Sequence, residues 1–358
     1  MSTGDAPRRA LVTGGSGYLG SEVVRQLVAA GVDVRVLDVV DDPGRPASAD
    51  LVVGDIRSSA DVRSALDGVD VVLHNVAQVP LAKDPELFES VNVGGTEVLL
   101  RACADAGVRK VVHTSSSAVF GVPRANPVTR DTEPRPAEAY GRAKLDAEHL
   151  CAAAVSRGLD VSIVRPRTVV GPGRLGIFGI LFDWIADGAA VPVLGRGDNR
   201  YQFVHAHDIA TACLLAAARP GPSVYNIGSE SFGTMRATLE TLCAHAGTGA
   251  RVVGLPKAVM RPLVQATGQL GLSPLGPYHW LMYGESMWFD VAPARDELGW
   301  RSRYSTDDAM REAYDWFLQR RDQPEQAGTS VHRRSAPQGV LRMGKRASRA
   351  LLVRQPRA

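Results

Sequence analysis

Residues 13–20 read Thr-Gly-Gly-Ser-Gly-Tyr-Leu-Gly, and this glycine-rich stretch decides the fold. A short apolar run at 10–12 precedes it, and residues 22–28 predict the helix that follows. In such a strand–turn–helix unit, glycines permit a tight turn and let the backbone approach a pyrophosphate, while the helix N-terminus faces the anion. The sequence therefore predicts a dinucleotide site at this turn. Its glycines are Gly14, Gly17 and Gly20.

An acidic residue ends the next predicted strand. Residues 34–38 read Val-Arg-Val-Leu-Asp, so Asp38 stands 18 residues after Gly20. A carboxylate at this place accepts hydrogen bonds from the ribose hydroxyls and repels a 2′-phosphate. The sequence therefore favours NAD over NADP as the cofactor, although Arg45 in the following loop could meet a phosphate.

Tyr140-Gly-Arg-Ala-Lys144 places a phenol and an ammonium four residues apart, on one face of a predicted helix. A free Tyr has a pKa of about 10, and a neighbouring Lys lowers it. Lowering that pKa to about 7 requires roughly 4 kcal/mol. A Tyr with such a pKa can take a proton from a substrate hydroxyl while a hydride leaves the same carbon. Tyr140 is therefore the candidate general base.

A run of hydroxyl side chains, Thr114-Ser115-Ser116-Ser117, follows the apolar residues 111–112. Ligands of doubly wound sheets bind at the carboxyl ends of the strands. The serine run therefore stands where a substrate hydroxyl could be bound. Ser116 lies 24 residues before Tyr140.

These features together resemble the extended short-chain dehydrogenase/reductase superfamily, in its NAD-dependent epimerase/dehydratase branch, over residues 8–320. The resemblance implies an α/β fold, with a doubly wound parallel (Rossmann) sheet and a smaller C-terminal substrate-binding portion. It implies that the catalytic residues are Ser116, Tyr140 and Lys144, with Ser115 and Ser117 as adjacent alternatives for the serine. It also implies the cofactor contacts Gly14, Gly17, Tyr18, Leu19, Gly20, Asp38, Asp55, Ile56, Val76, Ala77, Tyr140 and Lys144.

Two positions depart from the family's usual pattern. Members usually carry His-x-Ala-Ala after the fourth strand, whereas residues 74–77 here read His-Asn-Val-Ala. Val76 is bulkier than Ala, so packing against the cofactor is expected to differ locally. Phe120 stands where Tyr is usual, which is expected to alter packing only.

Strand-like and helical stretches alternate along the chain, as in βαβ units that build a parallel sheet. The predicted strands are 10–13, 34–38, 51–53, 69–74, 110–115 and 161–165, with helical stretches such as 86–107 and 139–157. We expect an NAD-binding domain at 8–165 and 201–217, a substrate-binding portion at 166–200 and 218–320, and a basic, disordered tail at 323–358. The resemblance implies a homodimer that uses the helices at 86–107 and 139–157.

Composition fits a soluble enzyme. The chain has 358 residues, 45% of them hydrophobic, with 36 glycines. Four cysteines lie far apart, and no apolar run reaches the roughly 18 residues that a membrane span requires, so we expect a cytoplasmic protein with reduced thiols. The cysteines are Cys103, Cys151, Cys213 and Cys243. His205-Ala-His207-Asp208 has a metal-like composition, but this place holds no metal in the family, and we expect no metal site.

Positive charge is concentrated at the end of the chain. Residues 320–358 carry ten Lys or Arg against two acidic residues, a net charge of +8, whereas the whole chain has +3. This segment also lacks aromatic residues, which is typical of a disordered segment. We expect a solvated tail and no nucleic-acid partner, and we keep contact with an anionic membrane surface as the less favoured alternative.

The residues after Ser116 narrow the reaction. Dehydratases of the family carry Asp-Glu there, and sugar decarboxylases carry a Glu at the second position, whereas this chain has Ser117-Ala118. Without these carboxylates, elimination and decarboxylation of those types are disfavoured. The expected reaction is reversible oxidation of a secondary alcohol, followed by hydride return to the other face or by release of the ketone.

Two substrate classes remain. Residues 165–172 are similar to the Arg-x-x-Thr-Val-x-Gly-Pro of uronate-type 4-epimerases, which implies that Thr168 contacts the substrate. Arg200, in Asp198-Asn199-Arg200-Tyr201, matches the arginine that binds the nucleotide diphosphate in such relatives. A sugar nucleotide is favoured on this basis. Alternatively, the apolar and aromatic stretch 255–289 resembles 3β-hydroxysteroid and sterol dehydrogenases and suits a lipid-like alcohol. A non-catalytic cofactor-binding protein is disfavoured, because such relatives typically lose Tyr140 or Lys144.

Overall fold

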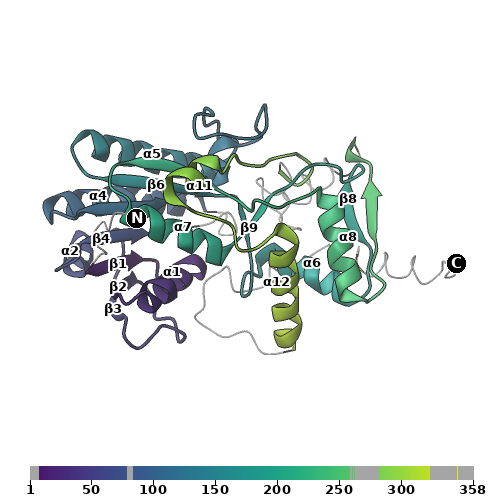
Figure 1. The fold of residues 1–358 in the computed structure, drawn as a ribbon, viewed down its shortest axis with the longest axis horizontal. Helices are drawn as coiled ribbons and strands as arrows, with labels where there is room; N and C mark the ends of the chain where they lie inside the picture. The colour runs from purple at the N-terminus through teal and green to yellow at the C-terminus, as the bar shows by residue number, and fades with distance from the viewer. Residues whose placement is uncertain are drawn as a thin grey trace, which may run out of the picture.

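The structure, a computed structural model, describes residues 8–78, 84–258, 260, 262, 282–322 and 345. These residues form two parts that lie side by side in Figure 1, a sheet covered by helices and a smaller lobe that contains α6, α8 and β8. The strand β9 and the helix α12 lie between the two parts.

A parallel sheet of seven strands forms the larger part, in the order β10-β6-β5-β4-β1-β2-β3. The sheet winds outward in both directions from β1 and β4, so a topological switch point lies between these strands. The predicted doubly wound α/β fold is therefore confirmed. The strands are β1 (Arg9–Thr13), β2 (Asp33–Asp38), β3 (Asp50–Val53), β4 (Val71–His74), β5 (Lys110–Thr114), β6 (Val161–Pro166) and β10 (Ser223–Ile227).

Helices cover both faces of this sheet, and each face has its own apolar core. Val12 and Val36 pack on one face, whereas Leu11 and Val72 pack on the other, because successive side chains of a strand point to opposite faces. Strands buried on both faces read as continuous apolar runs, which is why they could be predicted. The first face holds α1 (Tyr18–Ala29) and α7 (Ala206–Ala218), and the second holds α2 (Ser59–Ala65), α4 (Gly95–Asp105) and α5 (Ala139–Ser156).

The helix expected at 86–107 is interrupted. A short helix, α3 (Pro85–Leu87), leads into a π-helical segment, η2 (Phe88–Gly94), before α4 begins. The helix expected at 139–157 is continuous and corresponds to α5.

The smaller lobe is held together by an aromatic core. Phe182 contacts Phe178, Tyr314 and Phe317, with ring centroids 5.8 to 6.1 Å apart. The short strands β7 and β9 pair with each other at the junction with the sheet. The elements of the lobe and junction are β7 (Thr168–Val170), α6 (Gly176–Ala186), β8 (Val191–Leu194), β9 (Phe203–His205), α8 (Met235–Ala246), β11 (Val252–Leu255) and α12 (Thr306–Arg320).

Two later segments return to the sheet. β10 pairs with β6, although residues 223–227 fall in the stretch that we expect to bind substrate. The helix α11 (Ala292–Leu298) also packs on this side, because Ala294 and the nearby Trp300 belong to the same core as α1 and α7. The sequence of this region lacks the glycine-rich turn that marks the first βα unit, which is why its return to the sheet was not predicted.

Two predictions fall largely outside the described residues, those for the tail at 323–358, of which only Lys345 is described, and for the centre of the apolar stretch at 255–289. Among the residues that the structure does describe, no helix is long and apolar enough to cross a membrane.

Candidate functional site

The glycine-rich turn forms a cradle that only glycine can line. A Cβ atom on Gly20 would lie 2.0 Å from the carbonyl oxygen of Gly14, and one on Gly14 would lie 2.8 Å from the backbone nitrogen of Val76. Gly14 also has a φ of 70°, which favours glycine. The helix α1 begins at Tyr18, with no side chain capping its N-terminus and no acidic residue in its first turn. This end of α1 therefore offers its N–H groups to an anion at the sheet's switch point.

Asp38 lies at the end of β2, beside this cradle. Its carboxylate accepts hydrogen bonds from the backbone nitrogens of Ser16, at 3.0 Å, and Val39, at 2.8 Å. Burial raises the pKa of Asp38 above its usual value, against the opposing effect of these hydrogen bonds. Arg45 pairs with Asp41, with 2.9 Å between Nε and Oδ1. Asp38, the predicted ligand of the ribose, and Arg45, which could meet a phosphate, thus bond different partners.

The remaining predicted cofactor contacts follow the carboxyl ends of β3 and β4. The Asp55 carboxylate pairs with Arg57 at 2.5 Å, and Ile56 is buried beneath it. Val76 and Ala77 continue from β4, and Asn92 fixes the end of this segment through two hydrogen bonds with the backbone of Gln78, at 2.8 and 3.1 Å. Asn92 belongs to η2, so the π-helical segment places the side chain that fixes this loop.

Among the three serines after β5, only Ser116 is partly exposed. The Ser115 hydroxyl donates to Glu148 at 2.5 Å, and the Ser117 hydroxyl accepts from Arg167 at 3.3 Å. Ser116 accepts from the backbone nitrogen of Ala118 at 3.1 Å, which leaves its own proton available. This arrangement favours Ser116 over its neighbours as the residue that contacts a substrate.

Tyr140 stands in the first turn of α5, facing the segment that carries Ser116. The Glu138 carboxylate caps this helix by accepting from the backbone nitrogens of Tyr140, at 2.8 Å, and Gly141, at 2.7 Å. The Tyr140 ring is buried against Phe88, with centroids 5.9 Å apart, and in the same cluster as Ala118. The cap and this apolar contact fix the position of the candidate base.

Lys144 lies one turn further along α5 and is almost completely buried. Its Nζ donates to the carbonyl oxygen of Thr114 at 2.9 Å, at the end of β5. Burial lowers the pKa of Lys144 to about 8, while the negative charge of Glu148 acts in the opposite direction. The ammonium thus lies beneath the serine turn and on the same helix as Tyr140, as the spacing predicted.

The predicted substrate residues Thr168 and Arg200 lie in different surroundings. The Thr168 hydroxyl lies 3.0 Å from the Tyr201 hydroxyl and accepts from Nη1 of Arg167 at 2.8 Å. Arg200 is exposed instead, with its guanidinium 4.9 and 4.6 Å from the ring centroids of Phe232 and Trp288. Adjacent residues of an extended chain point to opposite sides, so only Tyr201 of this pair approaches Thr168.

Arg167 is a buried residue beside the serines that motif reading did not single out. Only 1% of it is exposed, and its guanidinium carbon lies 4.3 Å from the ring centroid of Tyr201. Its Nε donates to the Met287 carbonyl at 3.2 Å, and Nη2 has no hydrogen-bond partner among the described residues. The only signal for this residue in the sequence was its place directly before Thr168.

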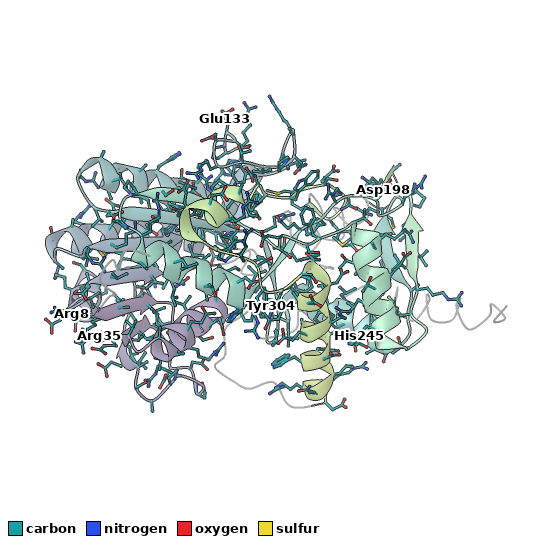
Figure 2. The ribbon with its side chains drawn as sticks, in the orientation of Figure 1. Arg8, Arg35, Glu133, Asp198, His245 and Tyr304 are labelled. Atoms are coloured by element: carbon teal, nitrogen blue, oxygen red, sulfur yellow. The ribbon has the colours of Figure 1, made fainter. Side chains whose placement is uncertain are left out.

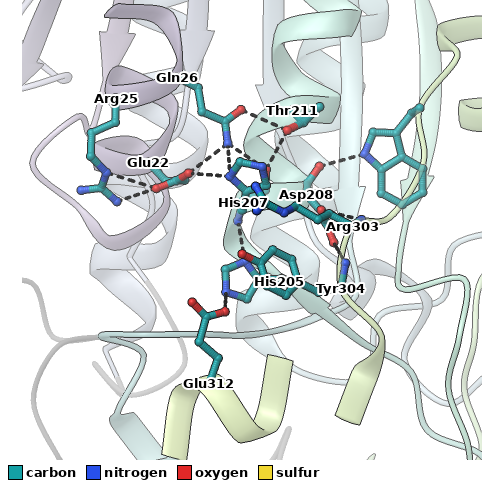
Figure 3. Close-up of polar contacts among 11 residues, drawn as sticks. Glu22, Arg25, Gln26, His205, His207, Asp208, Thr211, Arg303, Tyr304 and Glu312 are labelled. Atoms are coloured by element: carbon teal, nitrogen blue, oxygen red, sulfur yellow. Dashed lines mark hydrogen bonds and ion pairs between the residues drawn. The ribbon is translucent and has the colours of Figure 1, made fainter. Parts of the chain in front are cut away.

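A network of hydrogen bonds ties α1 to α7 and to the segment before α12 (Figure 3). Gln26 on α1 donates to the His207 carbonyl at 3.0 Å, and Asp208 accepts from the backbone nitrogens of Arg303 and Tyr304 at 3.0 and 3.2 Å. Tyr304 lies at the centre of the molecule, where the two parts meet (Figure 2). This network therefore connects α1, through α7, to the segment that precedes α12.

His205 and His207 both belong to this network. Nδ1 of His205 accepts from the backbone nitrogen of His207 at 3.1 Å, and its Nε2 lies 3.3 Å from Glu312. The His205 ring stacks on Tyr304 at 4.0 Å. Within the described part of the chain, no three His, Cys, Asp or Glu residues are placed to hold a metal ion.

The comparisons with known proteins identify the family of this chain. The family model described as the NAD dependent epimerase/dehydratase family matches residues 10–228, which include the cradle, Asp38 and all three candidate catalytic residues. The chain belongs to this family. The family is NAD-dependent, and the residues at the switch point fit that cofactor, because they combine a glycine cradle, an open helix N-terminus and a ribose acid.

The relatives span more than one substrate class. An uncharacterized protein, y4nG, of Sinorhizobium fredii is 49% identical over 93% of this chain and 85% of its own length. A UDP-glucose 4-epimerase of Streptomyces lividans is 29% identical, with 86% and 95% covered. The human sterol-4-alpha-carboxylate 3-dehydrogenase, decarboxylating, is 32% identical, with 59% and 57% covered. The solved structure of MoeE5 with UDP-glucose and NAD is similar at a TM-score of 0.69 and 26% identity, over 87% of this chain and 99% of that one.

Proposed function

We propose that the protein is a sugar-nucleotide 4-epimerase that uses Tyr140 as the base and transient hydride transfer to NAD. The observation that carries this proposal is a polar cluster that is bonded to the serine turn through Ser117. Arg167, Thr168 and Tyr201 form a connected cluster there, and no carboxylate pairs with Arg167 among the described residues. A buried cation without a counter-ion suits a substrate that is hydroxylated and anionic.

Each candidate residue has a distinct role in this proposal. When bound, NAD supplies a reversible hydride acceptor. Tyr140 takes the proton of the substrate's 4-hydroxyl, and Ser116 donates a hydrogen bond to the same oxygen. The buried Lys144 stabilises the Tyr140 phenolate from within α5. Arg200 binds the nucleotide diphosphate, and its stacking on Phe232 and Trp288 leaves the edge of the guanidinium available for phosphate oxygens.

The surroundings of Ser116 support epimerisation over elimination. Ser117 and Ala118 are both buried, and neither carries a carboxyl group. Glu148 is the acidic residue bonded to this turn, but Arg165 holds it in a two-bond ion pair, at 2.6 and 2.9 Å. Glu148 is therefore committed to a structural pair and is not offered as an acid for removing water.

A sterol-type dehydrogenase is the second candidate. It is supported by the human relative and by the buried apolar cluster in which Met282, Met287 and Phe289 pack with Val119 and Phe120, just after the serines. A sterol that carries a carboxylate would also present an anion to Arg167. The two candidates differ in what happens to the hydride, because an epimerase returns it and a dehydrogenase releases NADH.

The test follows both products in one assay. Purified full-length protein is incubated with UDP-glucose or UDP-glucuronic acid, and the 4-epimer is measured by chromatography. We expect epimer without accumulation of NADH, a large loss in Tyr140→Phe, and unchanged activity in Tyr225→Phe, whose hydroxyl bonds Glu297. NADH accumulating with a sterol alcohol and NAD, with no epimer from either nucleotide, would establish the second candidate instead. A Tyr140→Phe protein that matches wild type in every enzymatic and cellular output would point to a non-catalytic role.

The homodimer and the cytoplasmic location stay predictions. We infer that α4 and α5 would form the dimer interface, as the family resemblance implies. The mass of the purified protein in solution tests this directly.

A further inference from the structure

The loop between β7 and α6 turns back against the first residue of α1. Gly171 and Gly173 have φ values of 145° and 83°, which glycine adopts far more readily than other residues do. A Cβ on Gly171 would lie 2.9 Å from the Tyr18 hydroxyl oxygen, and one on Gly173 would lie 3.6 Å from the Tyr18 ring. The loop closes through a hydrogen bond from the Arg174 nitrogen to the Gly171 carbonyl, at 3.0 Å. A segment assigned to substrate binding therefore contacts the cofactor cradle.

This turn places the Arg174 guanidinium in an unusual position. Its central carbon lies 5.8 Å from the ring centroid of Tyr18, and its Nη1 is buried without a hydrogen-bond partner. Within the described ranges, no carboxylate pairs with Arg174, whereas Arg165, nine residues earlier in the sequence, is paired with Glu148 at 2.6 Å. A desolvated guanidinium without an anion is costly, and burial lowers the pKa of Arg174 to about 10, which still leaves it charged at neutral pH.

The residues around Arg174 indicate which anion it would bind. On one side lies Tyr18, the first residue of α1, whose N-terminus is open to an anion. On the other side, the loop continues from β7 (Thr168–Val170), and Arg167, directly before β7, bonds Ser117 of the serine turn at 3.3 Å. Arg174 would therefore meet a ligand that extends from the N-terminus of α1 toward the serine turn.

We propose that Arg174 binds the diphosphate of NAD from the substrate side of the cleft. The helix N-terminus and the guanidinium would then hold the diphosphate from two directions. Because Arg174 belongs to the loop that leads into α6, bound NAD would also fix this loop over the cradle. This role of Arg174 concerns cofactor binding alone, so it is the same whether the substrate is a sugar nucleotide or a sterol.

Binding to the cofactor-free, full-length protein tests this assignment without any substrate. NAD, ADP-ribose and AMP are titrated by calorimetry into wild type, Arg174→Gln and Arg174→Lys. A charged hydrogen bond contributes about 1.5–3 kcal/mol, so Arg174→Gln should weaken NAD and ADP-ribose by roughly 10- to 100-fold. AMP, which lacks the diphosphate, should change by less than about threefold, and Arg174→Lys should fall between the two. Arg196→Gln, an exposed arginine on another loop, is the matched control and should bind as wild type does.

Thermal unfolding gives a second reading that does not depend on affinity measurements. Removing an unpaired buried charge should leave the melting temperature of cofactor-free Arg174→Gln at or above that of wild type, while the rise caused by NAD becomes smaller. Wild-type affinity for NAD and ADP-ribose in Arg174→Gln, or a full NAD-induced rise in its melting temperature, would overturn the assignment. Equal losses for AMP and NAD would also overturn it, because they would place the effect outside the diphosphate.

Discussion

A Cβ atom on Gly141 would lie 2.5 Å from the carbonyl oxygen of Ala118. The helix α5 therefore touches the turn after the serines at a point where only a hydrogen atom fits. Tyr140 directly precedes this contact, and Ser116 stands two residues before Ala118. The distance between the candidate base and the candidate hydroxyl is thus set by one close backbone approach.

The first prediction concerns this contact. Gly141→Ala should push α5 away from the turn, because overpacking a well-filled site costs about 1–3 kcal/mol. We expect the melting temperature to fall by several degrees and turnover to fall by at least about tenfold, since small displacements of reacting groups are costly. Gly94→Ala is the control, because a Cβ atom there would lie 3.9 Å from the carbonyl oxygen of Glu89, an ordinary van der Waals distance. Wild-type turnover in Gly141→Ala would show that the close approach does not position Tyr140.

The second prediction concerns the base itself. Tyr140→Phe should keep the fold, because its ring still packs on Phe88. Turnover on the substrate found by the epimerase assay should fall by roughly 10²–10⁴-fold, the usual contribution of a general base. Cofactor affinity should stay within a few-fold of wild type, as measured by calorimetry. Turnover within about tenfold of wild type would mean that another group takes the proton.

The third prediction is a pH dependence that arises from Lys144. Burial lowers its pKa to about 8 in the folded protein, whereas an unfolded chain has about 10.4. Between these values the unfolded state holds more protons, so the free energy of unfolding rises with pH, and the penalty for the buried charge is complete only below about pH 8.

Comparing the cofactor-free wild type with Lys144→Met isolates this effect. The stability of Lys144→Met relative to wild type should be greatest near pH 7 and should fall by up to about 3 kcal/mol as the pH approaches 10. Urea denaturation at several pH values between these limits measures this difference. A difference that does not vary with pH would show that Lys144 does not change its proton between the two states.

The sequence predicted those features that depend on short stretches of chain. The turn at 13–20 needs only its own glycines and flanking strand, and the buried strands reveal themselves as apolar runs. The basic composition without aromatic residues begins at residue 320, and α12 (Thr306–Arg320), which a capping box with Ser305 starts, ends at the same point.

Features that depend on distant partners could not be predicted in this way. Arg165, Arg167 and Arg174 are chemically identical in the sequence, yet among the described residues Arg165 alone of the three pairs with a carboxylate, because Glu148 faces it from α5. Tertiary packing therefore decides which arginine pairs with a carboxylate and which is available to a ligand. The π-helical segment before α4 likewise depends on a distant contact. It places Asn92 where the side chain bonds Gln78, in the loop after β4.

The fourth prediction concerns the choice of cofactor. The Asp38 carboxylate should repel a 2′-phosphate, so wild type should bind NAD more tightly than NADP. Asp38→Ser should narrow the difference between the two cofactors, as measured by titrating each into cofactor-free protein. Asp41→Asn is the control, because it releases Arg45 without touching Asp38. Equal or tighter NADP binding by wild type would contradict the prediction. A gain in NADP binding by Asp41→Asn would identify Arg45 as the phosphate ligand.

The last prediction concerns the basic tail, of which Lys345 is the described residue. Its Nζ pairs with Asp187 at 2.7 Å and also with Asp183, and Arg321 bonds the same two carboxylates at 2.7 and 2.5 Å. Arg321 at the end of α12 would remain after removal of the tail. We therefore expect a protein that ends at Asp322 to keep its fold and turnover.

The size of the change follows from the loss of the ion pairs that Lys345 makes with Asp183 and Asp187. Partly exposed pairs contribute about 0–1 kcal/mol, so the melting temperature should fall by no more than about 4 °C. Lys345→Ala in the full-length chain should reproduce this change, and both differences should shrink at high salt because the interaction is electrostatic. A large loss of turnover in the truncated protein, with none in Lys345→Ala, would show that other tail residues contribute to the active site. Salt-sensitive binding of anionic vesicles by the full-length chain alone would instead assign the tail to a membrane surface.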